Sequence, residues 1–97
     1  MNQLSLFGYT IPRTAMLAPM AGIADRAYRQ LCKEYGAVLV VGEMASVKGL
    51  CYSDRKTAEL LTCTQEEFPM GVQLFGDDPA FFAKAAKIAA QYHPAFI

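Results

Sequence analysis

Gln73 is a polar side chain inside an apolar segment, Val72-Gln73-Leu74-Phe75. Burying an unpaired amide costs about 1–3 kcal/mol, so a glutamine there must have hydrogen-bond partners. A carboxamide carries both a donor and an acceptor, and it matches a ligand whose edge presents both. A neighbouring loop that satisfies the amide is the alternative explanation. Gln73 is therefore a candidate binding residue.

Pro19, Met20 and Ala21 follow the first apolar segment, Ala15-Met16-Leu17-Ala18, which we expect to be a short buried run. Proline has no N–H to donate to a strand ladder, so a strand must stop at Pro19. The neighbouring backbone groups and the methionine side chain can then lie against a flat ring. An ordinary strand end followed by a turn is the alternative.

Glu43 follows the second apolar segment, and it is expected near the same end of the sheet. Its carboxylate could shape a site through hydrogen bonds. Pairing with a nearby arginine or a backbone amide is at least as good an explanation. We therefore do not include Glu43 among the candidate binding residues.

The other reactive side chains indicate structural roles. Cys32, Cys51 and Cys63 are spaced 19 and 12 residues apart, which fits neither a CxxC metal site nor a dense disulfide framework. We expect no metal site, and reduced thiols in a cytoplasmic protein. Cys32 is expected in the core, and His93 at the end of a helix as a cap.

The composition excludes several classes of protein. With 54% hydrophobic residues among 97, the chain has enough apolar material for one small core and is not expected to be disordered. Nine basic and nine acidic residues give zero net charge, hence no basic surface for nucleic acid or for a membrane. No signal peptide is evident, and the apolar run at 37–41 is too short to cross a bilayer.

Strands and helices are expected to alternate. Short apolar runs predict strands near 15–19, 38–44, 70–75 and 95–97, and the continuous run at 37–41 is typical of a strand covered on both faces. Asp25 and Asp78-Pro79 are helix starts, which predict helices near 25–35 and 79–92. Residues 6–20 are expected to be extended, and residues 46–56 to form a loop that runs into a weaker helix near 54–61.

Each long helix has an expected core face. In the first, the spacing of the apolar residues places one group toward the core and leaves a charged group in solvent; the core group is Tyr28, Leu31, Cys32 and Tyr35, and the solvent group is Arg26, Arg29, Lys33 and Glu34. In the last, the core group is Phe81, Phe82, Ala85, Ile88, Ala89 and Tyr92.

This alternation predicts an α/β fold with parallel βαβ units. A complete (β/α)8 barrel needs about 250 residues, so three units and the start of a fourth strand make the N-terminal portion of a TIM barrel. A doubly wound nucleotide-binding fold is the competitor. It requires GxGxxG after the first strand, where this chain has APMAGIAD.

An ordered set of motifs resembles the tRNA-dihydrouridine synthase family: LAPMAGIADRAYRQLCKEYGA, then VGEM, then VQLFG, then a helix ending in HPAFI. The resemblance runs from about Leu17 to Ile97. It implies an FMN-binding TIM barrel followed by a helical tRNA-binding domain, NADPH as reductant, and hydride transfer from reduced flavin to uridine in tRNA. It also implies that the cofactor-binding residues are Pro19, Met20, Ala21 and Gln73.

The resemblance places the catalytic general-acid cysteine after the fourth strand, downstream of Ile97. We therefore expect residues 1–97 to be the N-terminal fragment of the barrel domain, with no catalytic residue of its own and no activity in isolation. Two alternatives stay open. One is another FMN-dependent barrel oxidoreductase, of the enone or dihydroorotate type. The other is a non-catalytic fragment that self-associates through its exposed strand edges.

Overall fold

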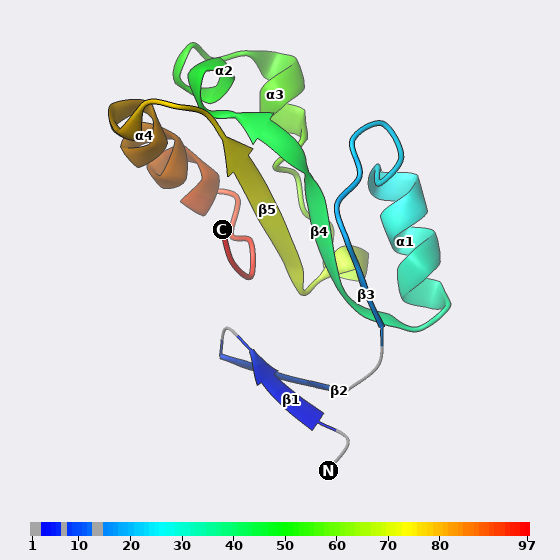
Figure 1. The fold of residues 1–97 in the computed structure, drawn as a ribbon. Helices are drawn as coiled ribbons and strands as arrows, with labels where there is room; N and C mark the ends of the chain where they lie inside the picture. The colour runs from blue at the N-terminus through cyan, green and yellow to red at the C-terminus, as the bar shows by residue number, and fades with distance from the viewer. Residues whose placement is uncertain (1–2, 7, 13–14) are drawn as a thin grey trace.

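The computed structural model describes residues 3–6, 8–12 and 15–97. Its central element is a parallel sheet with strand order β3-β4-β5, formed by β3 (Ala15–Leu17), β4 (Ala37–Ser46) and β5 (Met70–Phe75) (Figure 1). Beyond the last helix, Phe96 forms a parallel bridge with Gly71. The predicted parallel α/β arrangement is confirmed for three strands, and the strand predicted at 95–97 is represented by the single bridge at Phe96, beside β5.

The two long helices begin at the predicted caps. The Asp25 carboxylate accepts a hydrogen bond from the Tyr28 amide at 2.9 Å ahead of α1 (Arg26–Glu34). Asp78 accepts one from the Ala80 amide at 2.9 Å ahead of α4 (Pro79–Ala90). His93 lies just past α4 in the left-handed region (φ 54°), and its N–H donates to the Ala90 carbonyl. This is the geometry of a residue that ends a helix, as expected.

Three short helices connect β4 to β5. The predicted weak helix is α3 (Arg55–Glu59), preceded by α2 (Val47–Cys51) and followed by the 3-10 helix η1 (Gln65–Glu67). The sequence predicted a loop at α2. It is helical because Ser46 caps it by accepting from the Gly49 amide, and because its Leu50 is buried in the core.

The cap of α3 is the exposed carboxylate of Asp54. A hydrogen bond from the Thr57 hydroxyl lowers the pKa of that carboxyl below its usual value, since the bond favours the charged form.

An antiparallel hairpin precedes the sheet. Its strands are β1 (Gln3–Leu6) and β2 (Tyr9–Pro12), where the sequence predicted only extended chain. The hairpin lies beyond the end of the sheet at which β4 and β5 begin (Figure 1). There the Tyr9 ring packs edge-on against Phe68, with 5.4 Å between ring centroids. The hairpin covers the end of the sheet opposite to the strands' carboxyl ends.

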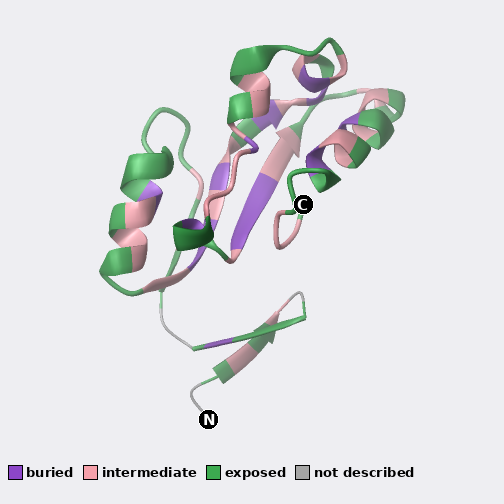
Figure 2. Ribbon diagram, turned by 180° about the vertical axis from the view of Figure 1, so that it is seen from behind, coloured by how far each residue is buried: buried purple, intermediate pink, exposed green. Residues whose placement is uncertain are grey.

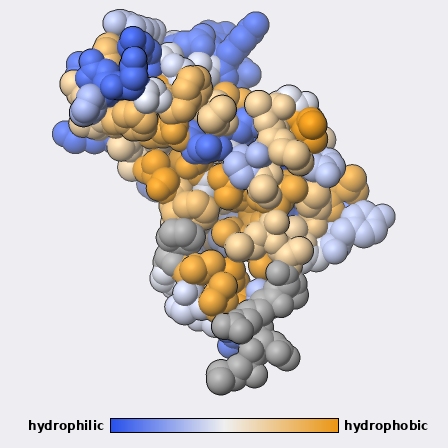
Figure 3. Space-filling model, viewed as in Figure 1, coloured by the Kyte–Doolittle hydropathy of each residue, from blue (hydrophilic) through white to orange (hydrophobic). Residues whose placement is uncertain are grey.

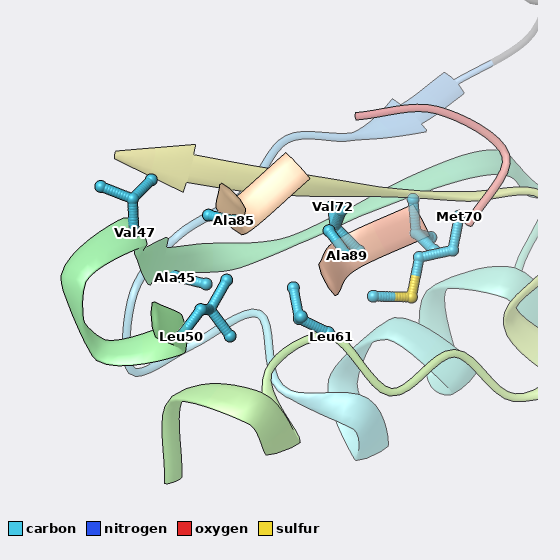
Figure 4. Packing of buried hydrophobic residues seen from close by; sticks show 9 residues of the cluster. Ala45, Val47, Leu50, Leu61, Met70, Val72, Ala85 and Ala89 are labelled. Carbon is cyan, nitrogen blue, oxygen red and sulfur yellow. The ribbon is translucent and has the colours of Figure 1, made fainter. Parts of the chain in front are cut away.

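The core lies between the sheet and the helices that cover one of its faces (Figure 4). It is made of buried aliphatic side chains from β4, α2, the segment after α3, β5 and α4: Val40, Ala45, Val47, Leu50, Leu61, Met70, Val72, Ala85 and Ala89. The core-facing prediction for α4 is confirmed for Ala85 and Ala89, with Phe81, Phe82 and Ile88 packed partly against the cluster. Tyr92, predicted on the same face, is exposed.

The opposite face of the sheet carries no helix within the described part of the chain. Figure 1 shows this face, whereas in the reverse view of Figure 2 the covering segments lie in front of the sheet. The face is largely apolar (Figure 3), with Met16 53% and Met44 46% exposed. The predicted burial of Ala15, Met16 and Ala18 is therefore wrong, as is the two-sided cover expected for β4, because only one face is packed.

The orientation predicted for α1 is wrong. Arg29 is buried at 5% exposure, whereas Tyr28, Leu31 and Tyr35 are exposed. The Arg29 guanidinium pairs with the fully buried Glu67 carboxylate of η1. It also donates to the Ala24 carbonyl at 2.7 Å. A charge that is buried without a partner costs more free energy than apolar side chains that stay exposed to solvent. The Arg29–Glu67 ion pair therefore determines which side of α1 faces the core.

Other side chains of α1 follow from this rotation. Lys33, predicted in solvent, is half-buried and donates to the Val38 carbonyl at 3.3 Å, and burial lowers its pKa. Cys32, predicted in the core, is half-buried. Arg26 and Glu34 are exposed as expected.

No helix among the described residues has the length and apolar character needed to span a membrane.

The Arg29–Glu67 pair generates a stability prediction. Glu67→Ala leaves a buried guanidinium without its partner, which should lower the free energy of unfolding by about 3–5 kcal/mol. The neighbouring exposed Glu66→Ala should change it by less than about 0.5 kcal/mol. Urea denaturation of the chain measures both. Equal effects of the two substitutions would show that the pair does not hold α1 against η1.

Candidate functional site

The four candidate residues lie toward one end of the sheet, the end at which β4 and β5 finish. The three strands run in the same direction, and the register places Leu17, the last residue of β3, level with Val40 of β4 and Met70 of β5. The segment that follows β3 therefore runs on toward the carboxyl ends of β4 and β5. Pro19, Met20 and Ala21 follow β3, and Gln73 lies near the end of β5, with β4 between them. All four thus lie toward the carboxyl ends of the strands, where parallel α/β folds carry their ligand-binding and active sites. The structure records no contact between Gln73 and residues 19–21.

Gln73 lies on the open face of the sheet. Side chains alternate along a strand, so Gln73 points away from the face on which Val72 packs into the core. Its Oε1 is buried, yet it has no hydrogen-bond partner among the described residues. The neighbouring loop that might have satisfied this amide is not found in that part of the chain. An orphaned buried acceptor requires an explanation, and a bound ligand is one.

A cavity of about 750 Å³ adjoins this amide. It runs along the edge of β5 beside α4, and Gln73 is the polar residue in a lining that is otherwise apolar: Val41, Val72, Leu74, Pro79, Phe82, Ala83, Ala86, Phe96 and Ile97. Apolar walls with few polar groups are typical of sites for small molecules and cofactors. Phe96 lines this cavity from the segment that bridges β5, so the end of the described chain borders the site.

The loop at residues 18–25 holds the other candidates in a tight turn. The Met20 carbonyl accepts hydrogen bonds from the amides of Ile23 and Ala24, at 3.0 and 2.7 Å. Gly22 has φ 76°, a conformation that favours glycine. Within this turn Pro19 is half-buried, whereas Met20 and Ala21 are exposed. Their surfaces are therefore open to a ligand.

Glu43 contacts this loop directly. Its carboxylate accepts a hydrogen bond from the Gly22 amide at 2.5 Å. Of the alternatives considered for Glu43, pairing with a backbone amide is the one observed.

Met44 is a residue of the open face that the sequence analysis did not identify. It pairs with Gln73 across the sheet, which places the two side chains on the same face. The sequence does carry a signal for Met44, because Gly42 lies inside an apolar strand and a glycine there indicates a β-bulge. A bulge changes which of the following side chains point to each face of the sheet.

The cysteines do not enter the candidate site. Cys51 ends α2, and its thiol lies 3.6 Å from the Phe81 carbonyl. Cys63 lies near the Arg29–Glu67 pair, where burial, followed by the Glu67 charge, raises the pKa of its thiol. A thiol with a raised pKa remains protonated and is a poor nucleophile.

Comparison with known proteins identifies the family. The sequence model of the family described as "Dihydrouridine synthase (Dus)" matches residues 16–97. The chain is 41% identical over 87 residues to tRNA-dihydrouridine synthase B of Pseudomonas aeruginosa, which is 90% of this chain and 26% of that protein. It is 39% identical over 79 residues to the synthase B of Shewanella oneidensis, covering 81% of this chain and 24% of the relative.

A third relative, tRNA-dihydrouridine synthase B of Pasteurella multocida, is 39% identical over 84 residues, which is 87% of this chain and 25% of that protein. The chain thus spans about a quarter of the length of the curated relatives it matches. The matched residues include the loop at 18–25 and β5, so the candidate residues all lie within the shared region. The chain belongs to the dihydrouridine synthase family.

Proposed function

We propose that residues 1–97 are the N-terminal part of an FMN-binding (β/α)8 barrel that reduces uridine in tRNA to 5,6-dihydrouridine. The observation that carries the proposal is the buried Oε1 of Gln73, which lies toward the carboxyl end of a parallel sheet and has no hydrogen-bond partner among the residues that the structure describes. Family membership supplies the context, because the matched relatives are named tRNA-dihydrouridine synthase B.

The residues present fit a flavin. The edge of an isoalloxazine ring carries both donors and acceptors, so a ring N–H suits the free acceptor of Gln73. Met20 and Met44 present exposed, polarizable side chains near the same edge, and thioethers pack well against flat rings. Pro19, Met20, Ala21 and Gln73 are accordingly the residues we propose to hold the ring. When bound, the flavin supplies the hydride chemistry, with NADPH as its reductant.

These residues orient a ring but provide neither its phosphate anchor nor the acid. In TIM barrels the phosphate site commonly follows strands seven and eight, and only the first strands are described here. We propose that the rest of the barrel, the general-acid cysteine and a helical tRNA-binding domain belong to sequence beyond these residues. Action on tRNA makes the cytoplasm the proposed compartment.

Self-association is a second property that the structure favours for the isolated chain. The outer edge of β3, which pairs with no other strand among the described residues, offers a surface for pairing. The open apolar face, with Met16 and Phe75 exposed, offers a surface on which a second chain can pack. In a complete barrel the same surfaces are internal. This property competes with the cofactor role only in the isolated chain.

The amide of Gln73 should be needed for flavin affinity. In a protein of the relatives' length that contains these residues (the barrel-length protein), Gln73→Ala should raise the dissociation constant for FMN about tenfold, the equivalent of one well-formed hydrogen bond. Titration followed by flavin fluorescence measures the constant, and circular dichroism checks the fold. Unchanged FMN affinity in a folded variant would remove Gln73 from the site.

In the absence of flavin, Gln73 should lower the free energy of unfolding of the chain. Gln73→Met replaces the unpartnered acceptor by an apolar group of similar size, which should raise the free energy of unfolding of the ligand-free chain by about 1 kcal/mol. The exposed Gln91→Met serves as the control, with no change expected beyond about 0.5 kcal/mol. Urea denaturation tests both. A loss of stability in Gln73→Met would mean that the amide already has a partner.

The 97-residue chain alone should not convert uridine to dihydrouridine in tRNA. It lacks the positioned acid, worth about 10²–10⁴ in rate, and its zero net charge does not by itself provide a surface for phosphate contacts. The assay combines the purified chain with FMN, NADPH and unmodified tRNA, with size-exclusion chromatography of the same sample to report its association. Turnover above a control without protein would contradict the proposed division of the active site.

A further inference from the structure

We propose that Glu43 is a positioning residue that holds the flavin-contacting loop at residues 18–25 in place through the Gly22 amide. The inference rests on the proposed flavin site, and it adds to that site a residue that contacts neither ring nor substrate. Its basis is the hydrogen bond from the Gly22 amide to the Glu43 carboxylate, which joins residues 21 positions apart.

A β-bulge aims this carboxylate. Val41 pairs with Gly71 and Met44 with Gln73, so β4 has two residues, Gly42 and Glu43, where β5 has one. The extra residue turns Glu43 out of the normal alternation and returns Met44 to the open face beside Gln73. Bulges next to active sites commonly re-aim a side chain in this way.

The first residue of the bulge, Gly42, packs closely against its neighbours. A Cβ at Gly42 would lie 2.8 Å from the Met70 Cε, the end of a flexible side chain, and 3.4 Å from the Leu60 carbonyl oxygen. A larger residue at this position would have to displace the Met70 methyl group, so glycine is the residue that fits the bulge without such a shift.

The loop is held from two sides. Gly22 lies at its tip in the left-handed region, and its amide is fixed by Glu43. The other end is fixed by Arg29, whose guanidinium donates to the Ala24 carbonyl at 2.7 Å. Met20 and Ala21 directly precede Gly22, and the Met20 carbonyl accepts from the amides of Ile23 and Ala24, so they belong to the same turn. Removing the Glu43 contact therefore frees the side of the loop that carries the proposed flavin contacts.

An ion pair does not account for the position of the Glu43 carboxylate. It lines a cavity of about 470 Å³ together with Arg26, Lys56 and Glu59. Among the described residues, the ion pair of Arg26 is made with Glu67 rather than with Glu43. The specific contact of this carboxylate is therefore the backbone amide of the loop, and a neutral amide side chain of the same length could replace it.

The first test measures the contact itself. Amide hydrogen exchange, followed by NMR in the barrel-length protein, should show the Gly22 N–H exchanging at least tenfold faster in Glu43→Ala than in the wild type. Glu43→Gln retains an acceptor oxygen and should restore most of the protection. Glu59→Ala removes an exposed carboxylate from the same cavity and should leave Gly22 unchanged. Equal exchange in Glu43→Ala and wild type would overturn the inference.

The second test measures the consequence for the flavin. Glu43→Ala should raise the FMN dissociation constant about tenfold, with rescue in Glu43→Gln and no change in Glu59→Ala. The absorption spectrum of the bound flavin should shift in Glu43→Ala alone, because the ring contacts from the loop change. Faster Gly22 exchange with unaltered FMN affinity and spectrum would also overturn the inference, since the loop position would not matter to the ring.

The two proposals fail in different ways. A wild-type barrel-length protein that binds no FMN would contradict the proposed function. Glu43 would then be judged as a loop-holding residue by the exchange measurement alone. If Glu43→Ala does not fold, the comparison of Glu43→Gln with wild type decides the matter: protected Gly22 and normal FMN affinity support the inference, and their loss opposes it.

Discussion

The buried ion pair between Arg29 and Glu67 is the constraint on which the rest of the structure depends. The two residues lie 38 positions apart, and they join α1, which follows β3, to η1, which precedes β5. Arg29 also donates to the Ala24 carbonyl, so one guanidinium holds both the loop at residues 18–25 and η1, the segment that leads into β5. Charges taken out of water cost several kcal/mol each, so neither partner is tolerated without the other.

The helices cover one face of the sheet and leave the other open. The covered face forms the core through Val40, Met70 and Val72, whereas the open face carries Met44 and Gln73. An apolar open face is unfavourable in an isolated small domain, but it is what the interior of a larger barrel requires. The proposed function thus gives a physical account of the exposed apolar face and of the unpartnered amide together.

Stability and the proposed function make opposite demands at Gln73. A buried acceptor without a partner destabilises the ligand-free fold, yet the same acceptor is available to a ring N–H. The surrounding elements are regular: β5 is paired on one side with β4 and bridged on the other by Phe96. A site on such rigid elements keeps its geometry without its ligand. The loop at residues 18–25 is less regular, and its fixed position depends on contacts from Glu43 and Arg29.

The sequence by itself determined the alternation of strands and long helices from β3 to α4, the parallel sheet, and the caps at Asp25 and Asp78, because these depend on short apolar runs and on contacts within one turn. It also indicated Gln73, because a polar residue in an apolar strand is visible without a fold. Only the tertiary structure decided which side of α1 is buried and where Glu43 points. The partners of Arg29 and Glu43 are 38 and 21 residues away, and no local periodicity encodes contacts at that distance. Local patterns decide which elements form, whereas the burial of a charge is decided by whichever distant group neutralises it.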